Sequence, residues 1–118
     1  MKKFEAFDFF DLDSNFTSEQ MQIRDSVRSI VDSEILPNIE QQHRNASFDK
    51  SILPKLGELG VLGPQFKGYE CAGVDYTSYG IIMRELERGD SGLRSVCSVQ
   101  SSLAMHSIYK KRTTLSFV

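Results

Sequence analysis

The sequence predicts an all-α fold, a small antiparallel helical domain. Four segments repeat apolar residues at steps of three and four positions, which is the period of an amphipathic helix. Each segment begins near a residue type that commonly caps helices, and the first three end near a proline or a glycine. No segment carries a convincing strand pattern. The length of 118 residues allows one modest domain.

The first helix is expected at Thr17–Leu36, after an aromatic and acidic arm at residues 1–16 that lacks regular structure of its own. Thr17-Ser18-Glu19-Gln20 fits the capping-box pattern, in which the first and fourth side chains satisfy backbone amides at the start of a helix. Pro37 removes a backbone donor and is expected to kink or end this helix, although the polar residues 38–45 can carry it onward.

Three more helices follow, and their expected bounds are Asp49–Leu59, Thr77–Arg88 and Ser91–Ile108. Asp49 is placed to cap the first of them, and Gly60 to end it in a left-handed conformation. The other two have candidate caps whose side-chain oxygens can accept from first-turn amides, namely Asp75 or Thr77 and Asp90 or Ser91.

Composition argues against several functional classes. A net charge of -2 gives no basic field for nucleic acid or anionic lipid, and no window has the roughly 18 uninterrupted apolar residues of a membrane span. Acidic residues among the first 13 positions argue against a secretory or transit peptide, so a bacterial cytoplasmic location is expected. Cys71 and Cys97 lack the spacing of zinc or redox motifs and are expected to be free thiols.

Two kinds of catalytic site receive little support. His43 and His106 stand apart from each other and from any acid at metal-ligand spacing, so we expect no metal site. The serines at positions 98, 101 and 102 have no histidine and aspartate in the order of a serine hydrolase.

The strongest candidate site surrounds Arg94. Ser98 lies four residues later on the same helical face, Ser95 is adjacent, and Glu87 precedes the helix break, where it can turn toward the guanidinium. An arginine supported by hydroxyls and oriented by a glutamate can bind a carboxylate. Spacing alone favours an Arg94–Glu87 ion pair with structural serines, since polar pairs four residues apart are common, and the carboxylate-binding interpretation stays open at this point.

Three segments resemble the N-terminal helical domain of glutaryl-CoA dehydrogenases, a branch of the acyl-CoA dehydrogenase family. They are Gly57–Pro64, Gly68–Val74 and Arg84–Leu103, the last continuing to Tyr109. The first two resemble acyl-CoA dehydrogenases in general, whereas the arginine and serines of the third are specific to the glutaryl branch. The resemblance divides the chain into an arm at residues 1–16, the helical domain at 17–109 and an aberrant tail at 110–118.

This resemblance implies an FAD-dependent oxidation of an acyl-CoA, with glutaryl-CoA or a related dicarboxylyl-CoA as substrate and decarboxylation to crotonyl-CoA. By the same resemblance, Arg94 and Ser95 contact the distal carboxylate of the substrate, Ser98 supports that contact, and Glu87 orients Arg94. The full-length enzymes of this branch are homotetramers and pass electrons to an electron-transfer flavoprotein.

The chain also departs from the family pattern. After Tyr109 the family continues into a β-domain with much of the flavin site and a second helical domain with the catalytic glutamate, whereas residues 110–118 resemble neither. The expectation is therefore a truncated domain, from a frameshift, premature stop or gene fragment, that is inactive alone. Leu93 stands where the family often has an aromatic residue. The rival hypothesis is a stand-alone helical interaction module that binds another protein through an exposed apolar stripe.

Overall fold

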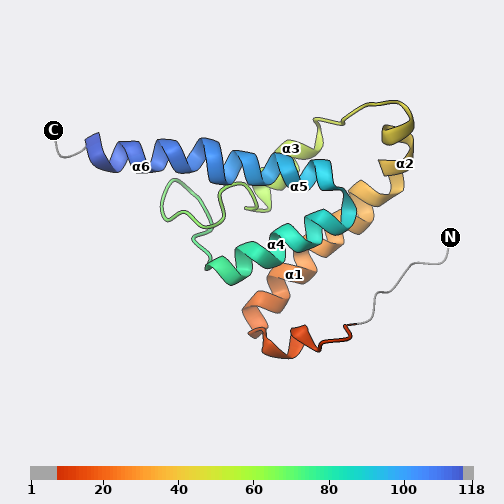
Figure 1. Ribbon diagram of the computed structural model, residues 1–118, viewed down its shortest axis with the longest axis horizontal. Coiled ribbons are helices and arrows are strands. Elements are labelled where there is room, and N and C mark those ends of the chain that lie inside the picture. Colours follow the sequence, from red (N-terminus) through yellow and green to blue (C-terminus); the bar gives the residue numbers. More distant parts are fainter. Residues whose placement is uncertain (1–7, 116–118) are drawn as a thin grey trace.

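The computed structural model describes residues 8–115, with side chains through position 111, and this part of the chain is built from helices without strands (Figure 1). The predicted all-α class is confirmed. The elements are a short 3₁₀ helix (Leu12–Asn15), α1 (Ser18–Ile30), a π-helical turn (Val31–Ile35), α2 (Leu36–Arg44), α3 (Ile52–Glu58), α4 (Tyr76–Gly89), α5 (Ser91–Ser98), a second π-helical turn (Val99–Met105) and α6 (His106–Leu115).

The first helix begins with the predicted capping box. The backbone N–H of Gln20 donates to Thr17 Oγ1 at 3.2 Å, and the N–H of Thr17 donates to Gln20 Oε1 at 3.0 Å. The helix runs on past the expected end at Leu36, because α1, the π-helical turn and α2 are continuous to Arg44. The wider turn lies just before Pro37, where the proline ring would otherwise meet the carbonyl of an ordinary helical turn.

The second predicted helix is shorter than expected. Asp49 does not cap it, since the Asp49 carboxylate accepts from the N–H of Ser51 at 2.9 Å in a turn before the helix. Helix α3 therefore starts at Ile52. Its end is as expected: Gly60 takes the left-handed conformation, with φ of 79°, that lets the chain turn back toward the body.

Aspartates cap both later helices. Asp75 accepts from the N–H of Ser78 at 2.7 Å, and Asp90 accepts from the N–H of Leu93 at 2.8 Å. The extended backbone of Asp90 ends α4 and separates it from α5. The last helix was expected to end at Ile108, but α6 continues to Leu115.

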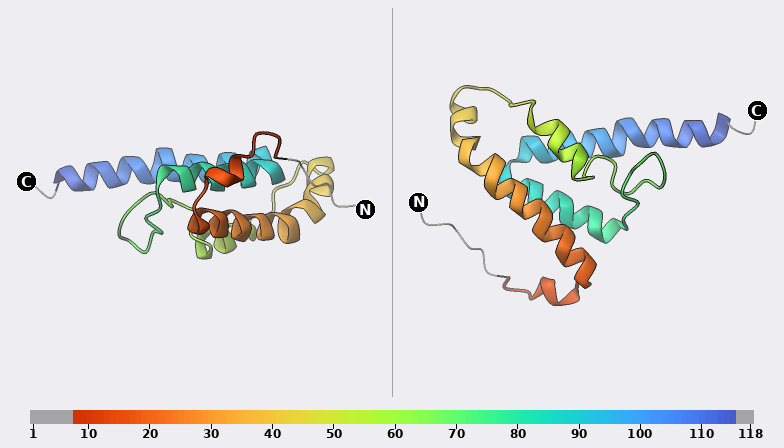
Figure 2. Two further views of the ribbon diagram at one scale, coloured as in Figure 1. Left: turned by 90° about the horizontal axis from the view of Figure 1, so that it is seen from below. Right: turned by 180° about the vertical axis from the view of Figure 1, so that it is seen from behind.

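The core forms where α1, α3, α4 and α5 pack together. Its most deeply buried apolar side chains are Val27, Val31, Leu56, Leu86, Leu93 and Cys97. The continuous rod of α5 and α6 crosses this body and projects beyond it at the C-terminal end (Figures 1 and 2). Within the described chain, no helix is both long and apolar enough to span a membrane.

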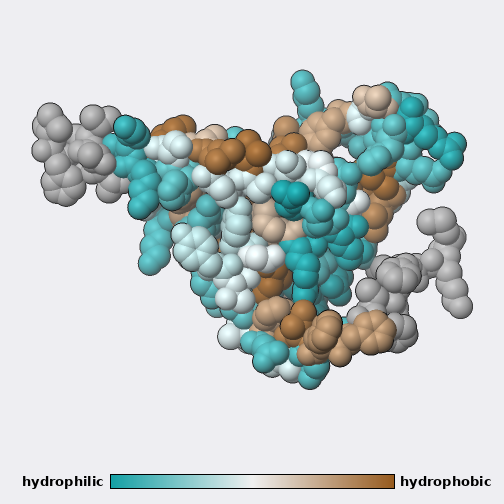
Figure 3. Space-filling model, viewed as in Figure 1, coloured by the Kyte–Doolittle hydropathy of each residue, from teal (hydrophilic) through white to brown (hydrophobic). Residues whose placement is uncertain are grey.

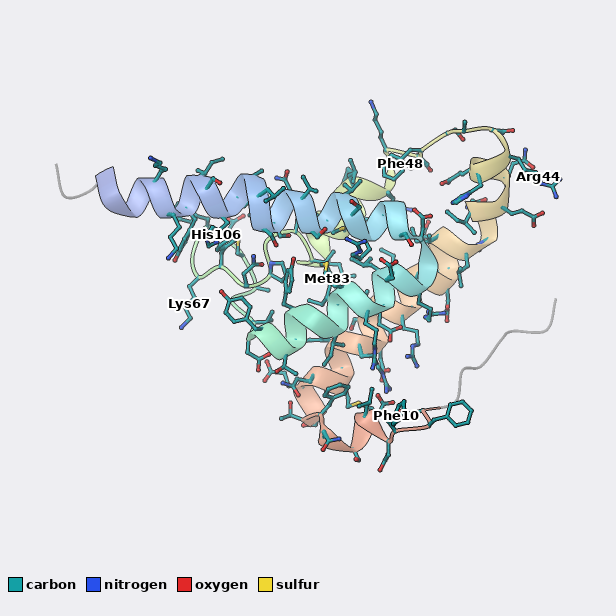
Figure 4. The ribbon with its side chains drawn as sticks, viewed as in Figure 1. Phe10, Arg44, Phe48, Lys67, Met83 and His106 are labelled. Carbon is teal, nitrogen blue, oxygen red and sulfur yellow. The ribbon has the colours of Figure 1, made fainter. Side chains whose placement is uncertain are left out.

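The N-terminal arm differs from the irregular segment that was expected. Residues 12–15 form the 3₁₀ helix, and the side chain of Phe16 lies under the guanidinium of Arg84, 5.7 Å from its ring centre. Phe10 is largely exposed and points away from the helices (Figure 4). Residues 1–7 of the predicted arm lie outside the described part of the chain.

A buried carboxylate ties α1 to α4. Only 1% of Glu85 is exposed, and its two oxygens accept from Arg28 Nε at 3.0 Å and Arg28 Nη2 at 2.8 Å. Arg88 Nε donates to the same carboxylate at 3.2 Å. Burial alone raises the pKa of Glu85, but its bonds to Arg28 and Arg88 outweigh burial and lower the pKa below its ordinary value.

Candidate functional site

The guanidinium of Arg94 lies at the junction of α4 and α5. Glu87 is in the last turn of α4, and the extended residue Asp90 lets α5 leave in a direction that brings Arg94 back to it. Arg94 Nε donates to Glu87 Oε2 at 2.6 Å. The predicted pairing of these two side chains is therefore present in the structure.

Ser98 joins the same site from one turn further along the rod. Arg94 Nη1 donates to Ser98 Oγ at 3.3 Å, and that hydroxyl donates in turn to the backbone carbonyl of Ser95 at 3.1 Å. Ser95 thus contacts the cluster through its backbone, and the structure brings only Glu87, Arg94 and Ser98 together by their side chains.

The positive charge of Arg94 is fixed in position by hydrogen bonds but remains accessible to solvent. The side chain of Arg94 is 36% exposed and that of Glu87 is 46% exposed. Hydrogen bonds from Arg94 and then from Ser91 lower the pKa of Glu87, so its carboxylate is ionised at neutral pH. Arg94 Nη2 has no hydrogen-bond partner among the described residues. The arrangement can therefore accept an external carboxylate on a guanidinium of fixed orientation.

Sequence reasoning missed one member of this cluster. The hydroxyl of Ser91 donates to Glu87 Oε1 at 2.6 Å. Ser91 was considered only as a helix cap, a role that Asp90 fills. Ser91 follows Glu87 by four residues, a spacing that brings side chains together within one helix. The break between the two helices made this spacing uninformative in the sequence.

The serines beyond Ser98 have structural partners. Ser101 is fully buried, and its hydroxyl accepts from the backbone N–H of Gly63 at 2.8 Å, which joins the rod to the loop after α3. The hydroxyls of Ser102 and Tyr79 lie 2.9 Å apart and join the rod to α4. These contacts hold the rod that carries Arg94 in its place on the body.

Apolar side chains are exposed along the rod beyond the arginine. Figure 3 shows apolar residues gathered on this part of the surface, and the exposed ones are Val96, Val99, Leu103 and Ile108. Val99 and Leu103 lie in the π-helical turn that follows α5. Exposed apolar side chains therefore follow the cluster of Glu87, Arg94 and Ser98 along the rod.

Two cavities lie outside the cluster of Glu87, Arg94 and Ser98. One, of about 50 Å³, lies between α2, α3 and the start of α5. The other, of about 150 Å³, is lined by Phe66, Tyr69, Cys71, Met105, Ile108 and Tyr109. Both are smaller than the roughly 300–1,000 Å³ of typical cofactor sites. Neither can enclose a flavin ring, and residues 8–115 contain no group of three side chains able to hold a metal ion.

Comparison with known proteins identifies the family to which the helical domain belongs. Residues 17–113 match the model of the acyl-CoA dehydrogenase N-terminal domain. The chain belongs to the acyl-CoA dehydrogenase family. The resemblance expected from the three sequence segments is thereby confirmed.

Solved acyl-CoA dehydrogenases include similar helical domains. A glutaryl-CoA dehydrogenase from Mycobacterium smegmatis in complex with FADH2 is 44% identical, with a TM-score of 0.82 over 85% of this chain and 26% of that one. A second structure of glutaryl-CoA dehydrogenase from this organism is 43% identical, with a TM-score of 0.82 over 86% of this chain and 27% of that one.

Curated acyl-CoA dehydrogenases are also similar over most of the chain. The short-chain specific mitochondrial enzyme of Rattus norvegicus is 32% identical over 75% of this chain and 22% of its own length. An acyl-CoA dehydrogenase of Bacillus subtilis is 30% identical over 78% of this chain and 24% of its own length. The chain thus spans about a quarter of the length of the relatives that it matches.

Proposed function

We propose that this chain is the N-terminal helical part of an FAD-dependent acyl-CoA dehydrogenase that oxidises and decarboxylates glutaryl-CoA to crotonyl-CoA. Its role is to bind the distal carboxylate of the substrate. The observation that carries this proposal is the guanidinium of Arg94, held by Glu87 at 2.6 Å and by Ser98 at 3.3 Å with Nη2 left for a ligand. The identity of 43–44% to two glutaryl-CoA dehydrogenase structures supports the choice of substrate.

The surface beside Arg94 suits the rest of a glutaryl group. A carboxylate bound to the guanidinium would lead into a short methylene chain, and the exposed apolar side chains of Val99 and Leu103 offer that chain a surface. Ser95 lies between the arginine and these residues in the helix and is proposed to contact the substrate carboxylate. A related dicarboxylyl-CoA would meet the same requirement.

The flavin and the catalytic base are assigned to other parts of the whole protein. Oxidation of the acyl chain needs FAD as the hydride acceptor and a carboxylate to take the α-proton, and the two cavities described above are too small to enclose a flavin. We assign to the described residues the binding of the substrate carboxylate and the orientation of the acyl chain. The whole protein is proposed to be a cytoplasmic homotetramer that passes electrons to an electron-transfer flavoprotein.

A hybrid enzyme tests the proposal. A complete glutaryl-CoA dehydrogenase whose helical domain is replaced by residues 17–113 of this chain should be yellow and should retain turnover of glutaryl-CoA. The matched control carries instead the helical domain of a short-chain acyl-CoA dehydrogenase, and it should lose the preference for glutaryl-CoA over butyryl-CoA. Equal preferences in the two hybrids would contradict the proposed substrate.

The second candidate function is a stand-alone helical interaction module. Exposure of the apolar residues along α5 and α6 favours it, because large exposed apolar patches often mark interfaces. The isolated chain is expected to be colourless under either function, because the flavin is assigned to other parts of the whole protein. The hybrid enzyme distinguishes the two: turnover of glutaryl-CoA supports the dehydrogenase, whereas a hybrid without turnover and a chain that binds a defined partner protein support the module.

A further inference from the structure

We propose that Ser91 is a positioning residue of the anion site, because its hydroxyl holds the Glu87 carboxylate and so keeps one nitrogen of Arg94 open for the ligand. This inference rests on the proposed role of Arg94 in carboxylate binding. It adds a residue to the four that the resemblance assigns, and it explains how a nearby glutamate can orient the arginine without occupying it.

The two oxygens of Glu87 are divided between two donors. Oε1 accepts from Ser91 Oγ at 2.6 Å, and Oε2 accepts from Arg94 Nε at 2.6 Å. The carboxylate therefore contacts the guanidinium through one oxygen only. This single contact fixes the direction of the arginine side chain and leaves Nη2 without a partner in the described structure.

Another ion pair in the same chain, which is more deeply buried, has the two-oxygen geometry. Glu85 uses both of its oxygens on one edge of Arg28, with Nε at 3.0 Å and Nη2 at 2.8 Å. This two-oxygen pairing is the favoured geometry of an arginine with a carboxylate. If Ser91 did not hold Oε1, the Glu87 carboxylate could turn and pair with Nε and Nη2 of Arg94 in the same way.

Such a turn would oppose ligand binding. A ligand carboxylate pairs with the outer edge of the guanidinium, through Nη1 and Nη2. With Oε1 of Glu87 beside Nη2, the Glu87 carboxylate would use one N–H of Nη2 and would bring its negative charge closer to the incoming carboxylate. The hydrogen bond from Ser91 prevents this turn by keeping Oε1 of Glu87 directed away from the guanidinium.

The hydroxyl of Ser91 is separate from the cap of α5. Asp90 caps the helix through the N–H of Leu93, and Ser91 is the first residue of the helix proper. Replacing the hydroxyl therefore leaves the cap in place. Ser91→Ala removes the donor, Ser91→Thr keeps it, and Ser107→Ala is a matched control at an exposed position on the same rod.

The test follows the Arg94 side chain in the ¹⁵N-labelled 118-residue chain by NMR. Ser91→Ala should slow rotation about the Nε–Cζ bond of Arg94 by about threefold or more, because a two-oxygen pairing restrains the guanidinium. Ser91→Thr and Ser107→Ala should match the parent chain. An unchanged rotation rate in Ser91→Ala would overturn the inference. If that variant loses its helical circular dichroism, Ser91→Cys, which weakens the donor at similar size, replaces it.

Titration with glutarate provides the second readout. Ser91→Ala should raise the dissociation constant, followed through the Arg94 Nε–H resonance, by about three- to tenfold. Equal affinity in the parent chain and Ser91→Ala would also overturn the inference. If glutarate shifts the Arg94 resonance in no variant, the proposed carboxylate site fails, while the rotation rate still decides the role of Ser91.

Discussion

Replacing Glu85 by Gln should markedly destabilise the domain. The side chain of Glu85 is 2% exposed and links α4 to α1 through Arg28, while Arg84 and Arg88 of its own helix also donate to it. Glutamine has almost the same shape but no charge, and its amide nitrogen would face arginine donors. The substitution therefore removes the charge and one hydrogen-bond acceptor of this cluster while it keeps the packing volume.

The structure sets the size of the effect. Removing one partner of a fully buried ion pair costs about 3–5 kcal/mol, because the remaining charge is left without compensation. Here the remaining charges are partly exposed, 40% for Arg28 and 32% for Arg88, so water can solvate them in part, and Arg88 keeps its ion pair with Asp32. We therefore expect the lower end of that range, about 3 kcal/mol. Domains of this size have a total stability of about 5–15 kcal/mol.

Urea unfolding followed by circular dichroism measures this loss, with Glu58→Gln at an exposed position as the control. The control should change stability by less than about 0.5 kcal/mol. Because the folded pKa of Glu85 is lowered, its stabilisation is complete above the unfolded value of about 4.3 and is lost as the pH falls through the folded value. Ordinary surface substitutions change the free energy of unfolding by only a small amount. If the free energy of unfolding of Glu85→Gln at pH 7 were within about 1 kcal/mol of the parent value, this reasoning would be refuted.

Two further predictions concern packing and thiol chemistry. Gly89→Ala should destabilise the domain by about 1–3 kcal/mol, since its new Cβ would lie 2.7 Å from Val31 Cγ1. Gly80→Ala, in open space on the same helix, should stabilise the domain. Equal effects of the two substitutions on the melting temperature would count against this packing. Burial raises the pKa of Cys97 to about 11, so at pH 8 a thiol reagent should label Cys71 and spare Cys97 until urea is added. Labelling of both thiols at similar rates in the folded chain would show that the helices open readily.

Local patterns in the sequence were sufficient for the helices and most of their caps. The capping box at Thr17 and the aspartates at positions 75 and 90 act through residues three positions away, so their chemistry is visible in a short window. Asp49 was misassigned because an aspartate can cap a helix or stabilise a preceding turn with the same carboxylate.

Features that depend on distant residues were not predictable from these patterns. The bond between Arg28 and Glu85 joins positions 57 apart in the sequence, and nothing local marks Glu85 as buried. Both interpretations of the site anticipated the pairing of Arg94 with Glu87 but not its geometry, because periodicity places residues on a face and does not fix the angle between two helices. Ser91 was missed for the same reason.

The most direct test of the carboxylate site measures substrate selectivity in the hybrid enzyme that carries residues 17–113 of this chain. Arg94→Ala should lower kcat/KM for glutaryl-CoA about 30- to 1,000-fold, because the desolvated substrate carboxylate loses its partner. This factor corresponds to a loss of about 2–4 kcal/mol in transition-state binding. Turnover of butyryl-CoA should hold or rise, since that substrate has no distal charge. Ser98→Ala should act in the same direction but more mildly. An equal loss for both substrates would show that Arg94 is structural and would contradict the account.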